Sequence, residues 1–267
     1  MIKKALTIAG SDSGGGAGIQ TDLKTFENIG VFGMSAITAI TAQNTLGVTA
    51  VHYLPTQMVA AQLDAVLSDI GTDAVKTGML GNAEIAAVVA EKLREYRLEK
   101  VVVDPVMVAT SGDLLLEERA VDVVKEKLLP LAFIVTPNKY EAEILAGMKI
   151  AGPADAREAA RRLHGMGAKG VLLKGGHFQG NSAVDLYYDG QAFHELAKPK
   201  VETRNQHGTG CTLAAAIAAY LCFDLPPLTA IAKAKDYVWQ RLQYASRHQV
   251  GAGSGPICLP FPPKETP

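Results

Sequence analysis

Short apolar runs rich in β-branched residues alternate along this chain with longer segments whose apolar residues recur at helical spacing. Residues 101–103, 133–135 and 171–173 are such runs, and none of them alternates with polar residues. Strands of this kind are buried on both faces, as in a parallel sheet that is covered by helices on either side. The alternation therefore predicts an α/β fold with a doubly wound, mostly parallel sheet flanked by helices.

The rest of the chain extends this plan. Residues 5–9 form another apolar run, and residues 32–54 read as two extended runs with a polar break between them. Residues 183–197 hold two alternating runs around an Asp-Gly pair, which predicts a small antiparallel hairpin. No repeat or low-complexity linker divides residues 1–267, so a single domain is expected. Helices are expected after residue 18, after Pro55, around 85–93, and over about 209–222 and 227–247.

Composition excludes several classes of protein. The chain has 267 residues, is 48% hydrophobic, and carries 26 Lys and Arg against 27 Asp and Glu, a net charge of −1. This apolar content is too high for a disordered chain, and the near-neutral charge gives no attraction to nucleic acid or to an anionic membrane. No signal peptide or membrane-length apolar stretch is visible. Cys211, Cys222 and Cys258 show no metal or disulfide spacing, so a cytoplasmic protein with free thiols is expected.

Two glycine-rich segments lie where the chain enters a predicted helix, and the first of them also follows a predicted strand. In an open parallel sheet, ligands bind beyond the carboxyl ends of the strands. Residues 10–18 and 207–212 each lead into a helix, and such turns let backbone N–H groups approach a phosphate. Neither segment matches a Walker A loop or the G-x-G-x-x-G fingerprint of dinucleotide enzymes. Each has an alternative interpretation as a tight turn that packs a strand against a helix.

Cys211 follows Gly208, Thr209 and Gly210 in the first turn of a predicted helix. A helix N-terminus lowers the pKa of a thiol, so a thiolate here is expected to accept a proton from a substrate hydroxyl. A cysteine in an alanine-rich helix is otherwise a small core residue, and that alternative stays open.

Charged residues at strand ends indicate a metal and phosphate site. Asp104 and Lys174 end two of the apolar runs, and Glu141 lies in the first turn of a helix. Carboxylates suit Mg²⁺ that is held jointly with substrate phosphates, and a lysine suits a polyphosphate. The alternatives are helix capping for the acids and a solvated surface position for the lysine. Together with the glycine-rich segments and the candidate base, these residues predict phosphoryl transfer.

Six motifs then occur in order along most of the chain: GSDSGGGAGIQ from Gly10, KTGML from Lys76, VDPVM from Val103, TPNKYE from Thr136, LKGGH from Leu173 and NQHGTGC from Asn205. They resemble the motifs of the hydroxymethylpyrimidine/phosphomethylpyrimidine kinases of thiamine biosynthesis, members of the ribokinase-like superfamily. The resemblance implies a homodimer that uses MgATP to phosphorylate 4-amino-5-hydroxymethyl-2-methylpyrimidine. The product is first the monophosphate and then the diphosphate.

The same resemblance implies roles for individual residues on the phosphate side. Residues 208–210 would form the anion hole for the transferred phosphoryl group, and Cys211 stands where the wider superfamily has an aspartate base. Asn138 and Glu141 match an Asn-x-x-Glu motif that organises Mg²⁺ and phosphate. Lys174 would lie near the nucleotide.

On the acceptor side, Gln43 matches the pyrimidine-binding glutamine of the family. A glutamine amide both donates and accepts hydrogen bonds, which suits an amino group beside a ring nitrogen. Met79 and Val106 are expected to provide apolar walls for the ring, and Gly10 is placed in the same substrate site. Asp22 is expected to bond a polar substituent.

The chain departs from the family pattern at Thr110, where many members have lysine, and at Gln206, where threonine is expected. A pyridoxine/pyridoxal kinase on the same fold is the nearest alternative. A dinucleotide-dependent oxidoreductase is disfavoured by the missing fingerprint. A ligand sensor without catalysis is disfavoured by the intact set of candidate catalytic residues.

Overall fold

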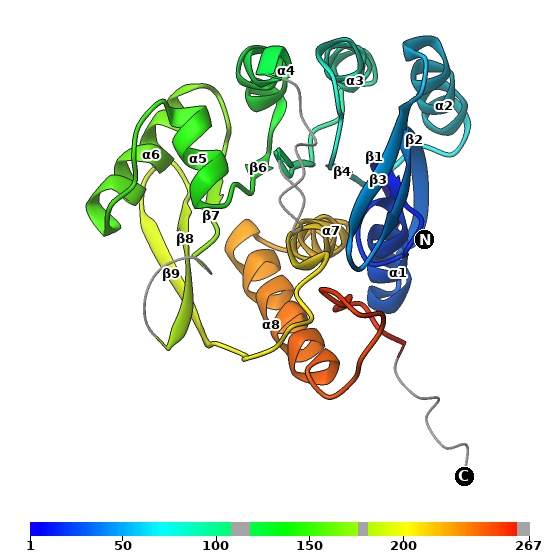
Figure 1. Ribbon diagram of the computed structural model, residues 1–267. Helices are drawn as coiled ribbons and strands as arrows, with labels where there is room; N and C mark the ends of the chain where they lie inside the picture. The colour runs from blue at the N-terminus through cyan, green and yellow to red at the C-terminus, as the bar shows by residue number, and fades with distance from the viewer. Residues whose placement is uncertain (108–117, 176–180, 261–267) are drawn as a thin grey trace.

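The computed structural model describes residues 1–107, 118–175 and 181–260 (Figure 1). Strands in these ranges form one nine-stranded sheet with the order β3-β2-β1-β4-β5-β6-β7-β8-β9. The strands from β2 to β7 in this order are parallel, whereas β3, β8 and β9 pair in antiparallel fashion. The predicted mostly parallel sheet is thus confirmed. The bounds are β1 Lys4–Asp12, β2 Phe32–Asn44, β3 Gly47–Tyr53, β4 Ala74–Thr77, β5 Val101–Val103, β6 Ile134–Val135, β7 Val171–Leu173, β8 Ser182–Tyr188 and β9 Phe193–Pro199.

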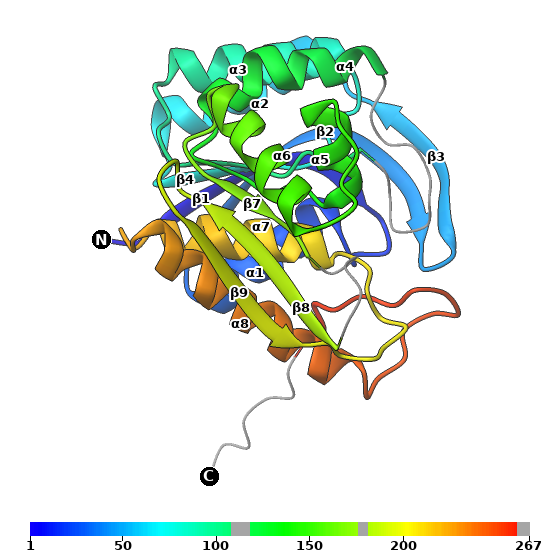
Figure 2. The ribbon, with the colours of Figure 1, turned by 90° about the vertical axis from the view of Figure 1, so that its left-hand side faces the viewer.

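Helices cover both faces of the sheet, as predicted (Figures 1 and 2). Helices α2 to α6 pack on one face and α1, α7 and α8 on the other, each layer with its own apolar core. Along β1, for example, Leu6 and Ile8 belong to one core and Ala5 to the other, because successive side chains of a strand point to opposite faces. The bounds are α1 Gly18–Ile29, α2 Thr56–Asp69, α3 Ala83–Glu95, α4 Glu118–Val123, α5 Lys139–Ala146, α6 Pro153–Gly165, α7 Thr209–Leu221 and α8 Pro227–Ala245.

Antiparallel pairs stand at both edges of the sheet. The β8–β9 pair is the hairpin that the Asp-Gly turn predicts, and Asp189 Oδ1 accepts the N–H groups of Gln191 and Ala192 in its turn. The β2–β3 pair is a second hairpin, where the sequence analysis expected only two extended runs. None of the helices within the described ranges is long and apolar enough to cross a membrane.

Candidate active site

The predicted site residues lie where the parallel strands end and α7 begins. Gly208 precedes α7 with φ of +78°, a left-handed conformation that favours glycine. A Cβ added there would lie 1.9 Å from the carbonyl oxygen of Gly16, so the two glycine-rich segments are in close contact. A Cβ added at Gly210 would lie 3.2 Å from Lys174 Nζ and 3.9 Å from Asp104 Oδ2. The start of α7 therefore faces the charged residues at the ends of β5 and β7.

Those charged residues form a compact cluster. Lys174 Nζ is 2.9 Å from Asp104 Oδ1 and 3.8 Å from Glu141 Oε2, and Thr136 Oγ1 donates to Asp104 Oδ1 at 3.1 Å. Burial raises the pKa of Glu141 to about 7, although the Lys174 charge opposes the rise. Burial also lowers the pKa of Lys174, but Asp104 and Glu141 outweigh it and hold that pKa above its ordinary value.

Asn138 and Glu141 cap helix α5 reciprocally. The Glu141 N–H donates to Asn138 Oδ1 at 2.9 Å, and the Asn138 N–H donates to Glu141 Oε2 at 2.7 Å. Such a capping box satisfies two N–H groups that a helix start leaves unpaired. The box also holds the Glu141 carboxylate beside Lys174. Glu141 therefore caps a helix, which is the alternative raised from the sequence, and also belongs to the charged cluster at the strand ends.

Asp104 and Glu141 could bind Mg²⁺ only together with ligands from outside the protein, such as phosphate oxygens and water. Within the described ranges, no three His, Cys, Asp or Glu side chains gather into a group that could hold a metal ion. Mg²⁺ is usually bound through one or two carboxylates together with substrate phosphates and water. Asp104 and Glu141, beside the start of α7, fit an ion that arrives with a polyphosphate.

Cys211 lies in the first turn of α7 and is partly buried. Burial raises the pKa of its thiol to about 11, against the opposing effects of the Lys76 charge and of a hydrogen bond from the Gly18 N–H. The sequence analysis expected the helix N-terminus to lower this pKa. Loss of solvation outweighs the helix dipole, so the resting thiol is protonated near neutral pH.

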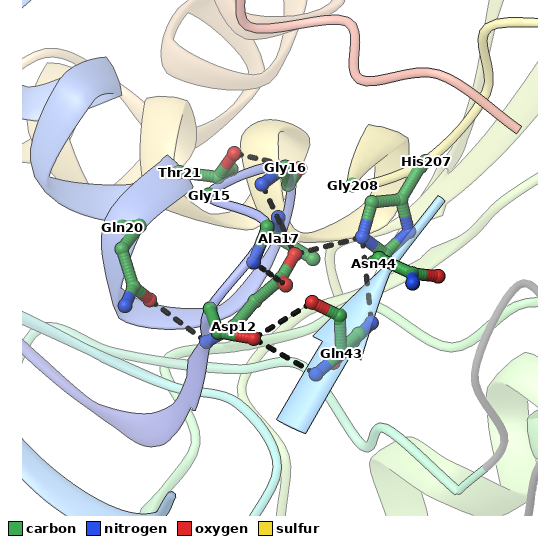
Figure 3. Close-up of polar contacts among 12 residues, drawn as sticks. Asp12, Gly15, Gly16, Ala17, Gln20, Thr21, Gln43, Asn44, His207 and Gly208 are labelled. Carbon is green, nitrogen blue, oxygen red and sulfur yellow. Dashed lines mark hydrogen bonds and ion pairs between the residues drawn. The ribbon is translucent and has the colours of Figure 1, made fainter. Parts of the chain in front are cut away.

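The first glycine-rich segment is organised by Asp12. Its carboxylate accepts the N–H groups of Gly14, Gly16 and Ala17 at 2.8 to 3.0 Å, and His207 Nε2 lies 2.8 Å from Oδ2 (Figure 3). Burial raises the pKa of Asp12, but His207 and the N–H groups hold it below its ordinary value. The pair thus joins the two glycine-rich segments. Neither residue has an individual role that the sequence predicts, because a contact across 195 positions leaves no local signal.

Gln43 ends β2 beside this pair. Its Nε2 is 3.4 Å from His207 Nε2 (Figure 3). Thr41 Oγ1 donates to its Oε1 at 3.2 Å. The side chain is partly buried and borders a hollow that His207 and Ser254 also line. The structure therefore places the predicted pyrimidine contact next to the segment that leads into α7.

The other predicted substrate residues fall into two groups. Gly10 and Met79 are in contact, since a Cβ added at Gly10 would lie 2.5 Å from Met79 Cε. Val106 lines a small pocket that Asp104 also lines. Asp22 is fully buried, and its Oδ2 accepts hydrogen bonds from Thr7 Oγ1 and Lys76 Nζ. Its predicted bond to the substrate stays a prediction. Thr110 lies outside the described residues.

The chain matches the phosphomethylpyrimidine kinase family model over residues 12–258. It is 53% identical over 260 residues to the hydroxymethylpyrimidine/phosphomethylpyrimidine kinase of Rhizobium meliloti, covering 96% of this chain and 97% of that protein. It is 54% identical over 252 residues to the thiamine biosynthesis bifunctional protein ThiED of Geobacter sulfurreducens, covering 94% of this chain and 51% of that protein, about half of its length.

A solved structure shares the whole fold. The pyridoxal kinase from Staphylococcus aureus in complex with AMP-PCP and pyridoxal superimposes with a TM-score of 0.88 and 39% identity, covering 96% of this chain and 93% of that one. Fold and site together define a ribokinase-like kinase. Within that class, the chain belongs to the phosphomethylpyrimidine kinase family.

Proposed function

We propose that this enzyme uses MgATP to phosphorylate 4-amino-5-hydroxymethyl-2-methylpyrimidine to its monophosphate and then to its diphosphate, in thiamine biosynthesis. The observation that carries the proposal is the start of α7, where Gly210, the neighbour of Cys211, faces Lys174 and Asp104. The names of the family and of its curated members support the same pair of activities.

On the donor side, the start of α7 receives the migrating phosphoryl group. Backbone N–H groups of residues 208–210 and the helix dipole favour negative charge there, and Lys174 adds a full positive charge. Asn138 keeps Glu141 in place through the capping box. We infer that Asn138 also contacts the nucleotide phosphates. When bound with ATP, Mg²⁺ would be held by Asp104 and Glu141 and would neutralise phosphate charge.

On the acceptor side, Gln43 orients the aminopyrimidine, while Gly10, Met79 and Val106 border the ring. In the first transfer, the Cys211 thiol first releases its own proton to water. The thiolate Sγ then accepts the hydroxymethyl proton as the oxygen attacks the terminal phosphorus of ATP and ADP leaves. In the second transfer the acceptor is a phosphate oxygen, which is already ionised near neutral pH. The base is therefore needed for the first transfer more than for the second.

The test is ATP consumption by the purified protein with hydroxymethylpyrimidine and, in parallel, with pyridoxal, with the products identified by mass spectrometry. Pyridoxal is included because of the likeness to the Staphylococcus aureus enzyme. We expect pyrimidine monophosphate followed by diphosphate, with a higher kcat/KM than for pyridoxal. Efficient turnover of pyridoxal with none of the pyrimidine would contradict the proposal.

We further infer a cytoplasmic homodimer. The β2–β3 edge exposes apolar side chains, including Ile40 at 44% and Val51 at 38% exposure, as interfaces between copies commonly do. Sedimentation velocity is expected to give twice the 28.2 kDa of the chain, and a monomer at all concentrations would contradict it. Cell fractionation tests the location.

A further inference from the structure

The first glycine-rich segment leads from β1 into α1, where the sequence predicts a phosphate-binding turn. Four consecutive N–H groups of this segment already have acceptors inside the chain. Asp12 Oδ1 accepts from Gly14 at 2.8 Å, and Oδ2 accepts from Gly16 at 3.0 Å and from Ala17 at 2.8 Å. The Asp12 carbonyl oxygen accepts from Gly15 at 2.9 Å. Successive backbone N–H groups of this kind bind anions, and here the anion is a carboxylate of the same chain.

Ser13 connects this segment to the end of β2. Its Oγ donates to the Gln43 carbonyl oxygen at 2.7 Å and accepts from the Gln43 N–H at 2.8 Å. The parallel pairing of β1 with β2 ends at Asp12 and Thr41, so the Ser13 hydroxyl binds the backbone of Gln43 just beyond the last pair. Ser13 is exposed to solvent. Its two bonds therefore fix the position of Gln43 without belonging to an apolar core.

The side chain of Gln43 meets the same segment through His207. Its Nε2 is 3.4 Å from His207 Nε2, which lies 2.8 Å from Asp12 Oδ2 (Figure 3). The imidazole also packs on the segment, because a Cβ added at Gly16 would lie 2.5 Å from His207 Cδ2. The segment thus holds Gln43 directly through the Ser13 hydroxyl and borders its amide through His207.

We propose that Ser13 is a positioning residue for Gln43, and that residues 12–17 serve the acceptor side of the reaction and bind no phosphate of the nucleotide or of the substrate. The proposal rests on the proposed function, in which the Gln43 amide orients the aminopyrimidine. An amide pairs with a ring edge only when its direction is fixed, because hydrogen bonds weaken steeply with misalignment. Asp12 holds the segment in the shape that presents the Ser13 hydroxyl to β2.

Ser13→Ala removes both bonds from an exposed position, so the fold should persist. We expect KM for hydroxymethylpyrimidine to rise about tenfold, the scale of one or two hydrogen bonds, while KM for ATP stays unchanged. Ser13→Thr keeps the hydroxyl and should restore most of the affinity. Ser68→Ala is the matched control, because it removes an exposed hydroxyl that donates to the Asp64 carbonyl oxygen within α2. It should leave both KM values unchanged.

The acceptor monophosphate separates positioning from phosphate binding. It carries the same ring as the alcohol, so Ser13→Ala should raise both KM values by the same factor. A larger rise for the monophosphate, or an equal rise for ATP, would show that the segment binds phosphate and would overturn the proposal. Unchanged KM values for all three substrates would overturn it as well.

A double-mutant cycle shows whether Ser13 acts through Gln43. Gln43→Ala should raise KM for the pyrimidine, and Ser13→Ala should add less than about twofold in that background, because the amide that it positions is gone. Independent effects that multiply would overturn the proposal. Turnover of pyridoxal alone by the parent protein would contradict the proposed function instead, and the same cycle with pyridoxal would then decide whether Ser13 positions Gln43.

Discussion

At Cys211, two influences on one thiol oppose each other. The first turn of a helix favours a thiolate, and partial burial disfavours it. Burial is the stronger influence in this site, and it raises the thiol pKa to about 11. The chemistry of this residue therefore depends on charges from β4, α1 and the ends of β5 and β7, which the motif around Cys211 does not contain.

Cys211→Ala is expected to lower kcat for the first phosphorylation by about 10²- to 10⁴-fold, the usual scale for a general base. The second phosphorylation should fall less, because its acceptor oxygen is already ionised. Single-turnover assays with the alcohol and with its monophosphate measure the two steps separately. Cys222→Ala, at the other end of α7, is the control for a lost thiol and should keep both rates. Equal losses in both steps would argue against a base.

Gln43→Ala is expected to raise KM for the pyrimidine at least tenfold and to change KM for ATP much less, because the amide is proposed to bind the acceptor and not the nucleotide. Steady-state kinetics with each substrate varied in turn measure this. Gln191→Ala, an exposed glutamine next to the β8–β9 turn, is the matched control. Equal rises in both KM values would contradict the assignment.

At the level of elements, the turn into α7 depends on backbone contact more than on side chains. Gly208 has φ of +78° and abuts Gly16, and Asp12 and His207 join the same two segments from the side. The geometry of this turn, the proposed anion-binding site, is thus set by α7 and the glycine-rich segment together.

Gly208→Ala should therefore lower kcat/KM by about 100-fold, the scale of a displacement near 1 Å in a catalytic group. It should also destabilise the fold by more than the about 1–2 kcal/mol that a left-handed conformation costs alanine. Gly147→Ala is the control, because Gly147 has φ of +63° but nothing within 4 Å of an added Cβ. Urea denaturation and kinetics compare the two. Equal effects would show that strain alone, and not the contact with Gly16, matters.

Across the whole molecule, one buried ion pair among the described residues ties helix α8 to the β8–β9 hairpin. Lys235 Nζ on α8 lies 2.6 Å from Asp185 Oδ2 on β8, and both side chains are 8% exposed. Asp185 Oδ1 accepts the Gly175 N–H at 2.8 Å, next to Lys174. This pair thus connects α8, the hairpin and the strand end that carries a site residue.

Lys235→Met leaves a buried carboxylate without its cation and is expected to lower the free energy of unfolding by about 3–5 kcal/mol. Asp185→Asn/Lys235→Met removes both charges and keeps an acceptor for Gly175, so it should lose less. Urea denaturation of the three proteins measures both values. A double variant no more stable than Lys235→Met would contradict a specific role for the buried charge.

The sequence by itself determined the fold class, the β8–β9 hairpin and the set of strand-end residues, because apolar periodicity and turn composition are local properties of the chain. It also carried the family motifs that the comparisons confirm. The β2–β3 hairpin, the Asp12–His207 contact and the surroundings of Asp22 were decided only by tertiary structure. Each depends on which segments pack together, and on how much water that packing removes from a charged or titratable side chain.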